Sequence, residues 1–271
     1  MPIAASLCLA VAATWQALVL VVDDRRIRRQ GGQAYRSGLG WTDADLLRRR
    51  RRWYPVPLVA GPGLALSTTF PERVGYAVGA LCCAVLLVWI GAETRFTRAR
   101  FTNLCLALLA GALLLQVLDS RTTLLPNTTA PLAASFFAAQ LYLVAGIRKL
   151  RSPQFLSGRV LLDNLVYGSV QAAAGNREFP PLFRPHQLPA ILERGYLSST
   201  CRVGAIIVTA AELTLGLGAL GWPPARPTLI LAVITHTAFL LISPIRILPF
   251  SSASLGLLVV ATEHPILAGI R

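Results

Sequence analysis

Residues 3–22 read IAASLCLAVAATWQALVLVV, and the charged run DDRRIRR follows at once at positions 23–29. An α-helix needs about 20 mostly apolar residues to cross the hydrocarbon core of a bilayer, and this stretch is long enough. No basic residue precedes it, whereas a cleavable signal peptide begins with a basic region. We therefore expect a retained membrane helix at the start of the chain.

The composition of the whole chain is that of a membrane protein. Of its 271 residues 54% are hydrophobic and only 14% are charged, against about 25% charged residues in a typical soluble domain. The formal net charge of +14 would fit a nucleic-acid-binding protein, but the basic residues lie between long apolar runs, as in the cytoplasmic loops of membrane proteins. We therefore expect no nucleic-acid partner, and we exclude a soluble enzyme and a disordered tail.

Seven further apolar stretches follow residues 3–22. The strong ones are residues 74–92, 101–118, 131–147, 203–221 and 228–247. Two stretches are weaker. Residues 55–70 are a short stretch for a span and contain Gly61-Pro62-Gly63, and residues 251–269 are interrupted by Glu263 and His264. The predicted fold class is an all-α, polytopic membrane helix bundle of about eight spans, or seven if a weak segment is re-entrant.

The distribution of basic residues predicts the orientation. With eight spans and the N-terminus outside, segments 23–54, 93–100 and 148–202 and the turn at Arg246 are cytoplasmic and hold 22 of the 26 basic residues. Basic cytoplasmic loops are the rule in cell-membrane proteins. The arginine runs in 23–54 either act only as this topology signal or also bind anionic lipid headgroups.

We expect residues 1–271 to form a single membrane domain, because the longest polar stretch, 148–202, has only 55 residues. That stretch is unusually apolar and rich in proline for a solvated loop. Residues 160–170 have the pattern of an amphipathic interfacial helix. Long loops of this kind are often lids, so we expect this one to contain interfacial or re-entrant segments, to fold back against the membrane face and to close a cavity.

Lys149 ends the fifth predicted span and is the only lysine in the chain, against 25 arginines. A buried amine can lose its proton and act as a base, whereas a guanidinium group stays charged. Tyr142 and Gly146 share its helix face by their spacing, and Gly146 leaves room for a ligand or a close helix. The alternative is a lysine that extends from a helix end toward the membrane surface.

Two more polar residues lie inside predicted spans, where ionisable groups are costly and often functional. Glu212 either forms an ion pair with Lys149 or Arg202 or acts as a buried acid. His236 either hydrogen-bonds across helices or transfers a proton. The predicted catalytic residues are Lys149, Glu212 and His236, and the candidates for substrate contacts are Gln140, Tyr142, Gly146, Arg148, Asp119 and Arg202.

No metal site is expected. The cysteines lie in or beside apolar stretches without CxxC spacing, which is typical of small buried hydrophobic residues. His236 has no second histidine three or four positions away, so one helix does not supply a histidine pair for a metal ion.

The segment LVAGIRKL at 143–150, followed by Phe155 and Gly158, resembles a signature of the vitamin K-dependent gamma-carboxylase-like family, also called the HTTM domain. In that family the second basic residue of the motif is the catalytic base, and it falls on Lys149. Two further likenesses follow in the same order: ELTLG at 212–216 resembles an acidic helix start, and His236 with Phe250 resembles a histidine helix. The resemblance covers about residues 100–260.

The resemblance implies lyase-type chemistry on a reduced isoprenoid quinone within the bilayer. A lysine deprotonates the hydroquinone, oxygen adds, and the strong base that results drives a second reaction such as carboxylation. The chain departs from the family in having no histidine before His186 and a phenylalanine, Phe155, near the usual tryptophan. We also expect no large domain for a peptide substrate, so the resemblance applies to the membrane core and its lipophilic ligand.

We therefore expect a membrane enzyme with a cavity among spans four to seven that accepts an isoprenoid or quinone, with Lys149 as the base. An apolar pocket would exclude the water that quenches reactive intermediates. One alternative is a terpenoid cyclase in which protonated Glu212 or Asp119 attacks an olefin or epoxide. Another is a non-catalytic membrane or lipid-binding subunit, in which Lys149, Glu212 and His236 never meet.

Overall fold

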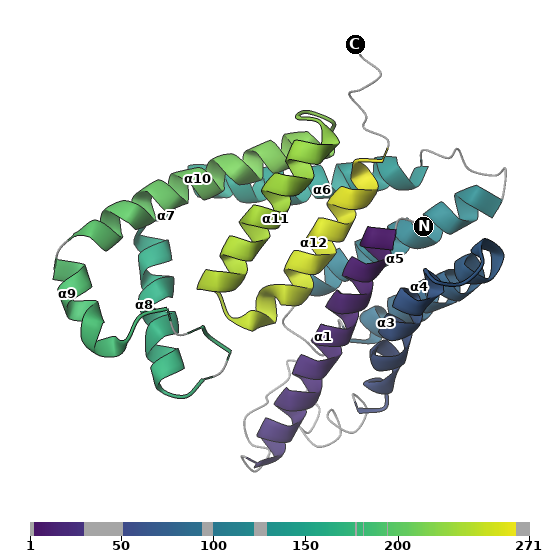
Figure 1. The fold of residues 1–271 in the computed structure, drawn as a ribbon, viewed down its shortest axis with the longest axis horizontal. Helices are drawn as coiled ribbons and strands as arrows, with labels where there is room; N and C mark the ends of the chain where they lie inside the picture. The colour runs from purple at the N-terminus through teal and green to yellow at the C-terminus, as the bar shows by residue number, and fades with distance from the viewer. Residues whose placement is uncertain are drawn as a thin grey trace. The chain divides into compact units, whose positions relative to one another are not determined.

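The computed structural model describes residues 3–29, 51–93, 100–121 and 129–263, apart from positions 177, 181 and 194. Its regular structure is helical throughout (Figure 1). Most of the basic segment 23–54 lies outside the described residues.

The helices confirm the predicted polytopic membrane bundle. Six of the described helices are long and apolar enough to cross a membrane, and they occupy the positions of the six strongest apolar stretches. Two shorter apolar helices, within 55–67 and 245–261, occupy the two weaker stretches. Residues 55–67 are too few for a full span because a helix rises only 1.5 Å per residue.

The chain divides into two compact units, and α6 (Thr129–Leu150) runs from the first into the second. The first unit comprises residues 1–134 and 248–260. Its other helices are α1 (Ile3–Arg29), α3 (Pro55–Ser67), α4 (Glu72–Glu93), α5 (Arg100–Arg121) and α12 (Leu248–Ala261).

Close packing brings α12 into the first unit although it lies far away in the sequence. A Cβ atom at Gly256 would lie 2.5 Å from Leu109 of α5 and 3.0 Å from Cys8 of α1, so only glycine fits between these helices. The Ser252 hydroxyl donates a hydrogen bond to the Cys8 carbonyl at 2.8 Å. In a bilayer, where the hydrophobic effect does not drive helices together, such small-residue contacts and interhelical hydrogen bonds hold them.

The second unit comprises residues 135–247 and 261–271 and contains every candidate site residue except Asp119. Besides most of α6 its elements are α7 (Pro153–Leu156), α8 (Arg159–Ala173), η1 (Pro185–Gln187), α9 (Leu188–Glu193), α10 (Tyr196–Ala219), α11 (Ala225–Ile242) and η2 (Ile245–Ile247). The amphipathic helix expected at 160–170 is present as α8 (Figure 1).

The segment between α6 and α10 folds back on α10. Leu161 of α8 is buried with Leu197, Cys201 and Ala205 of α10, and Phe183 packs against them. Gly158 has a φ of +81° and lies so close to α10 that a Cβ atom would come within 2.3 Å of the Arg202 backbone nitrogen. Positive φ and this contact both require glycine.

A salt bridge ties the far end of this segment to the turn after α11. The Arg246 Nε and Nη2 atoms donate to the two carboxylate oxygens of Glu178, each at 2.6 Å. The Ile245 backbone N–H donates to the Glu178 carbonyl at 2.8 Å. A two-point arginine–carboxylate contact fixes orientation as well as distance, so the segment is held at both ends.

Candidate functional site

Two glycines let α6 and α10 approach closely. A Cβ atom at Gly146 would lie 2.8 Å from the Leu213 side chain, and one at Gly216 would lie 2.6 Å from the Leu143 side chain and 3.0 Å from its backbone nitrogen. Each helix therefore places a leucine on the glycine of the other. A helix therefore fills the space beside Gly146, which is the close-helix alternative of the two that the sequence leaves open.

This close packing brings Lys149 and Glu212 together. Lys149 lies one turn after Gly146 on α6, and Glu212 lies one turn before Gly216 on α10. The Lys149 ammonium group donates a hydrogen bond to Glu212 Oε1 in an ion pair. The Lys149 side chain is 23% exposed and that of Glu212 is 6% exposed, so the pair is approached from the lysine side.

The second carboxylate oxygen of Glu212 has no hydrogen-bond partner among the described residues. Its Oε2 atom is buried and accepts no hydrogen bond from any residue that the structure describes. A buried acceptor without a donor is costly, and the usual reasons for one include a catalytic role or a missing ligand. Glu212 can therefore still accept or deliver a proton through Oε2 while Oε1 is bound to Lys149.

Two aromatic rings flank the lysine nitrogen. The Lys149 Nζ atom lies 5.1 Å from the centre of the Phe155 ring and 5.2 Å from that of the Phe239 ring. Both distances are within the range of a cation–π interaction. Phe155 belongs to the short helix α7, whose N-cap Ser152 accepts a hydrogen bond from the Phe155 backbone N–H at 3.2 Å.

Tyr142 and His236 form a second polar pair. Their Oη and Nε2 atoms are 2.6 Å apart, and the two residues are only 3% and 4% exposed. The sequence makes Tyr142 a candidate substrate contact, but its hydroxyl is engaged with His236 inside the unit because α11 lies against this face of α6. Of the two roles considered for His236, the structure shows the hydrogen bond across helices.

The Phe239 ring lies beside both polar pairs. It packs edge-to-face against His236, with ring centres 5.9 Å apart and planes at 81°, and it is also the ring 5.2 Å from Lys149 Nζ. The two polar pairs are separate hydrogen bonds, one between Lys149 and Glu212 and the other between Tyr142 and His236. Sequence reasoning missed Phe239, although its place one helical turn after His236 was a signal for it.

The remaining predicted contacts lie apart from this cluster. Gln140, Arg148 and Arg202 are exposed, and Glu212 pairs with Lys149 rather than with Arg202. Arg202 is ten residues from Glu212 on α10, which is nearly three helical turns. The Asp119 side chain lies outside what the structure describes. Within the described ranges no three histidine, cysteine, aspartate or glutamate residues are grouped so that they could hold a metal ion.

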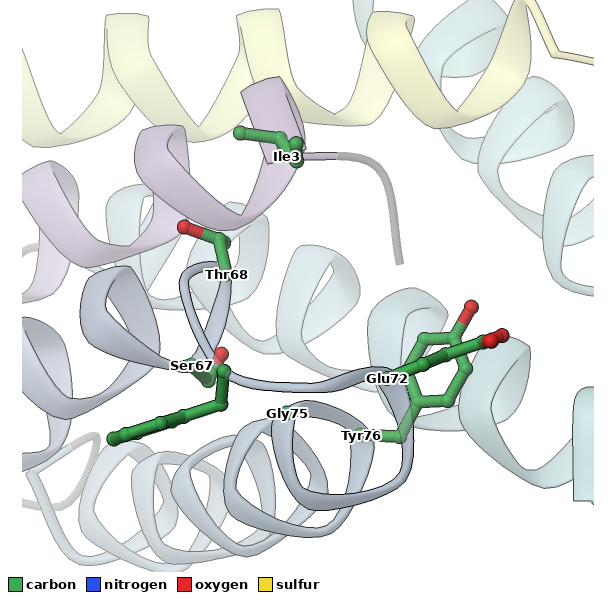
Figure 2. A pocket seen from close by; sticks show the side chains of 7 residues that line it. Ile3, Ser67, Thr68, Glu72, Gly75 and Tyr76 are labelled. Carbon is green, nitrogen blue, oxygen red and sulfur yellow. The ribbon is translucent and has the colours of Figure 1, made fainter.

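A shallow hollow occurs elsewhere, in the first unit. Figure 2 shows it between the start of α1 and the α3–α4 turn, with Glu72 and Tyr76 side by side on one wall. The hydroxyls of Ser67 and Thr68 each donate to a carbonyl of their own helix at 2.7 Å. None of the predicted site residues lines this hollow.

Replacing Tyr142 with phenylalanine is expected to lower the free energy of unfolding by about 1 kcal/mol, because interhelical hydrogen bonds in membranes contribute roughly 0.6 to 1.7 kcal/mol. Reversible unfolding in detergent micelles measures the change. Tyr167→Phe is the matched control, because Tyr167 is 56% exposed and its contact with Phe179 uses only the ring. Equal stability losses in both variants would contradict a stabilising role for the Tyr142–His236 bond.

No family model, no curated protein and no solved structure matches this chain.

Proposed function

We propose that this chain is an integral membrane enzyme of the vitamin K-dependent gamma-carboxylase-like type that acts on a lipophilic isoprenoid or quinone, with Lys149 as the base. The observation that carries the proposal is the contact between the sole lysine of the chain and Glu212, a carboxylate that is 6% exposed inside an apolar helix pair. Ionisable groups at such positions are costly and are kept mainly for function.

The pair offers a simple route for a proton. The ammonium of Lys149 can pass a proton to Glu212, which leaves a neutral amine beside a neutral acid. In surroundings of low polarity this exchange costs little, because burial penalises both charges. The amine can then take a proton from a hydroxyl or an activated C–H group of the substrate, and the anion that forms lies beside the new ammonium.

An isoprenoid hydroquinone is the proposed cofactor or substrate. Phe155 and Phe239 provide aromatic surface next to Lys149, and a quinone ring stacks favourably on such surfaces. With the proposed N-terminus-outside orientation in the cell membrane, Lys149 lies near the cytoplasmic interface, where a lipid headgroup would reach it.

A terpenoid cyclase remains a second candidate, and the partnerless Oε2 atom of Glu212 favours it. Such an enzyme starts by protonating an olefin or epoxide, and the acid must be buried and aimed at the substrate. Lys149 would then serve as the counter-ion of Glu212. The third interpretation, a non-catalytic subunit, required that Lys149, Glu212 and His236 never meet, whereas Lys149 and Glu212 are in contact.

Mass spectrometry of lipids that co-purify with the intact protein tests the proposal. We expect a quinone or hydroquinone in the wild-type protein and a clear depletion of it in Lys149→Met. A prenylated aromatic compound would favour the cyclase instead. Arg159→Met is the matched control, because the Arg159 side chain is 77% exposed. Recovery of bulk phospholipid alone, at equal amounts in all three proteins, would contradict both enzyme proposals.

A further inference from the structure

Three different elements converge on the nitrogen of Lys149. Glu212 comes from α10, Phe155 from α7 and Phe239 from α11. Lys149 itself lies in the last turn of α6, so the sequence separations are as large as 90 residues, and helical periodicity alone brings none of these groups together. An arrangement with one carboxylate and two ring faces is the type that proteins use to hold an ammonium ion.

The positions of both rings are fixed by their own surroundings. Phe155 packs against the buried cluster around Leu161 and Cys201, and Gly158 presses the same segment against the α10 backbone. Phe239 is held by its edge-to-face contact with His236, and His236 is in turn bound to Tyr142. The rings therefore face the nitrogen as a consequence of the packing of α7, α10 and α11.

We propose that Phe155 and Phe239 are positioning residues that hold Lys149 as an ammonium ion against Glu212. Each ring presents the negative face of its π-system to the cation and favours the charged form over the amine. Of the three groups around the nitrogen only Glu212 can accept a proton, so a proton that does leave Lys149 is passed to Glu212. In that step an N–H bond of the ammonium breaks and an O–H bond of the carboxyl forms, with no change of oxidation state.

This inference builds on the proposed function only in naming Lys149 as the base, and its test needs no substrate. Because Lys149 is the only lysine, the acylation of one internal peptide by an amine-reactive ester reports on it alone. The α-amino group is resolved as a separate peptide. Only the neutral amine reacts, and the 23% exposure of the Lys149 side chain gives the reagent access.

We expect Phe239→Leu and Phe155→Leu each to speed the acylation of Lys149 about fivefold at a fixed pH, as the loss of one cation–π contact predicts. Phe239→Tyr and Phe155→Tyr keep the ring face and should react at the wild-type rate. Phe136→Leu is the matched control, because Phe136 belongs to the same helix as Lys149 but is 61% exposed and faces Phe137. Its rate should also stay at the wild-type value.

A second arm separates protonation from access. If the rings act on the charge, the acylation rate of each leucine variant divided by that of the wild-type protein is the same for a small and a bulky ester. A ratio that grows with reagent size, unchanged rates in both leucine variants, or tyrosine variants as fast as the leucine variants would each overturn the proposal. Should Phe239→Leu fail to fold, Phe155→Leu on the four-residue helix α7 decides the matter. If these results overturn the role of the two rings but a quinone still co-purifies with the protein, the proposed function is unaffected.

Discussion

Replacing Lys149 with arginine is expected to lower the turnover number by about 10²- to 10⁴-fold, the usual contribution of a general base. The guanidinium group keeps the positive charge and can still pair with Glu212, but it does not release its proton in a protein. The fold should therefore survive while the base is lost. Single-turnover conversion of the lipid found in the wild-type protein measures the effect.

The same substitution separates the two enzyme proposals. A cyclase that begins with protonation by Glu212 needs only a counter-ion at position 149, so Lys149→Arg would leave it partly active. Arg151→Lys is the matched control, because this exposed residue undergoes the reverse exchange two positions further on. Wild-type turnover in Lys149→Arg would rule out the base mechanism.

Replacing Gly216 with alanine is expected to lower the free energy of unfolding by about 1–3 kcal/mol, the usual cost of overpacking. The added Cβ atom would lie 2.6 Å from the Leu143 side chain and 3.0 Å from the Leu143 backbone nitrogen. Since a backbone atom cannot rotate away, α6 and α10 must separate. Gly146→Ala should act in the same direction, because its Cβ atom meets Leu213 at 2.8 Å. Reversible unfolding in detergent measures both.

Gly91→Ala and Gly111→Ala provide the controls for this effect. Both positions lie within helices, and an added Cβ atom would meet nothing within 4 Å. Alanine is the better helix former by about 1 kcal/mol, so these two variants should be as stable as the wild type or more stable. Equal destabilisation at all four glycines would show that the α6–α10 contact has no special role.

Much of the fold could be predicted because helix length and hydropathy are local properties of a sequence. The apolar stretches in the sequence correspond to helices of the structure, but among the described residues only six of them are long and apolar enough to span a membrane, against the eight or seven spans expected. The ends were predicted less well. Helix α10 begins at Tyr196, seven residues before the expected start, because Gly195 takes a positive φ. Helix α11 ends at Ile242 because Pro244 follows, and proline restricts the residue before it.

The candidate site could be predicted only in part. Lys149, Glu212 and His236 stood out because polar groups are rare inside apolar stretches, and the Lys149–Glu212 pair was one of two pairings considered for Glu212. Phe155 was part of the quoted motif and Phe239 lies one turn after His236, but neither ring was expected beside Lys149, because that contact depends on how α7, α10 and α11 pack. Glu178 and Arg246 were missed as a pair because both lie in segments where charge is ordinary.

The amino-acid sequence alone determined that the chain enters a membrane, how many apolar helices it forms and which few polar side chains they carry. The tertiary structure alone decided which of these side chains meet. Which polar side chains pair depends on how closely, and at which register, α6, α10 and α11 pack. That register depends on contacts of Gly146 and Gly216 with leucines more than 65 residues away in the sequence. Such contacts have no local signature, because a glycine that admits a ligand and a glycine that admits a helix look the same in a sequence.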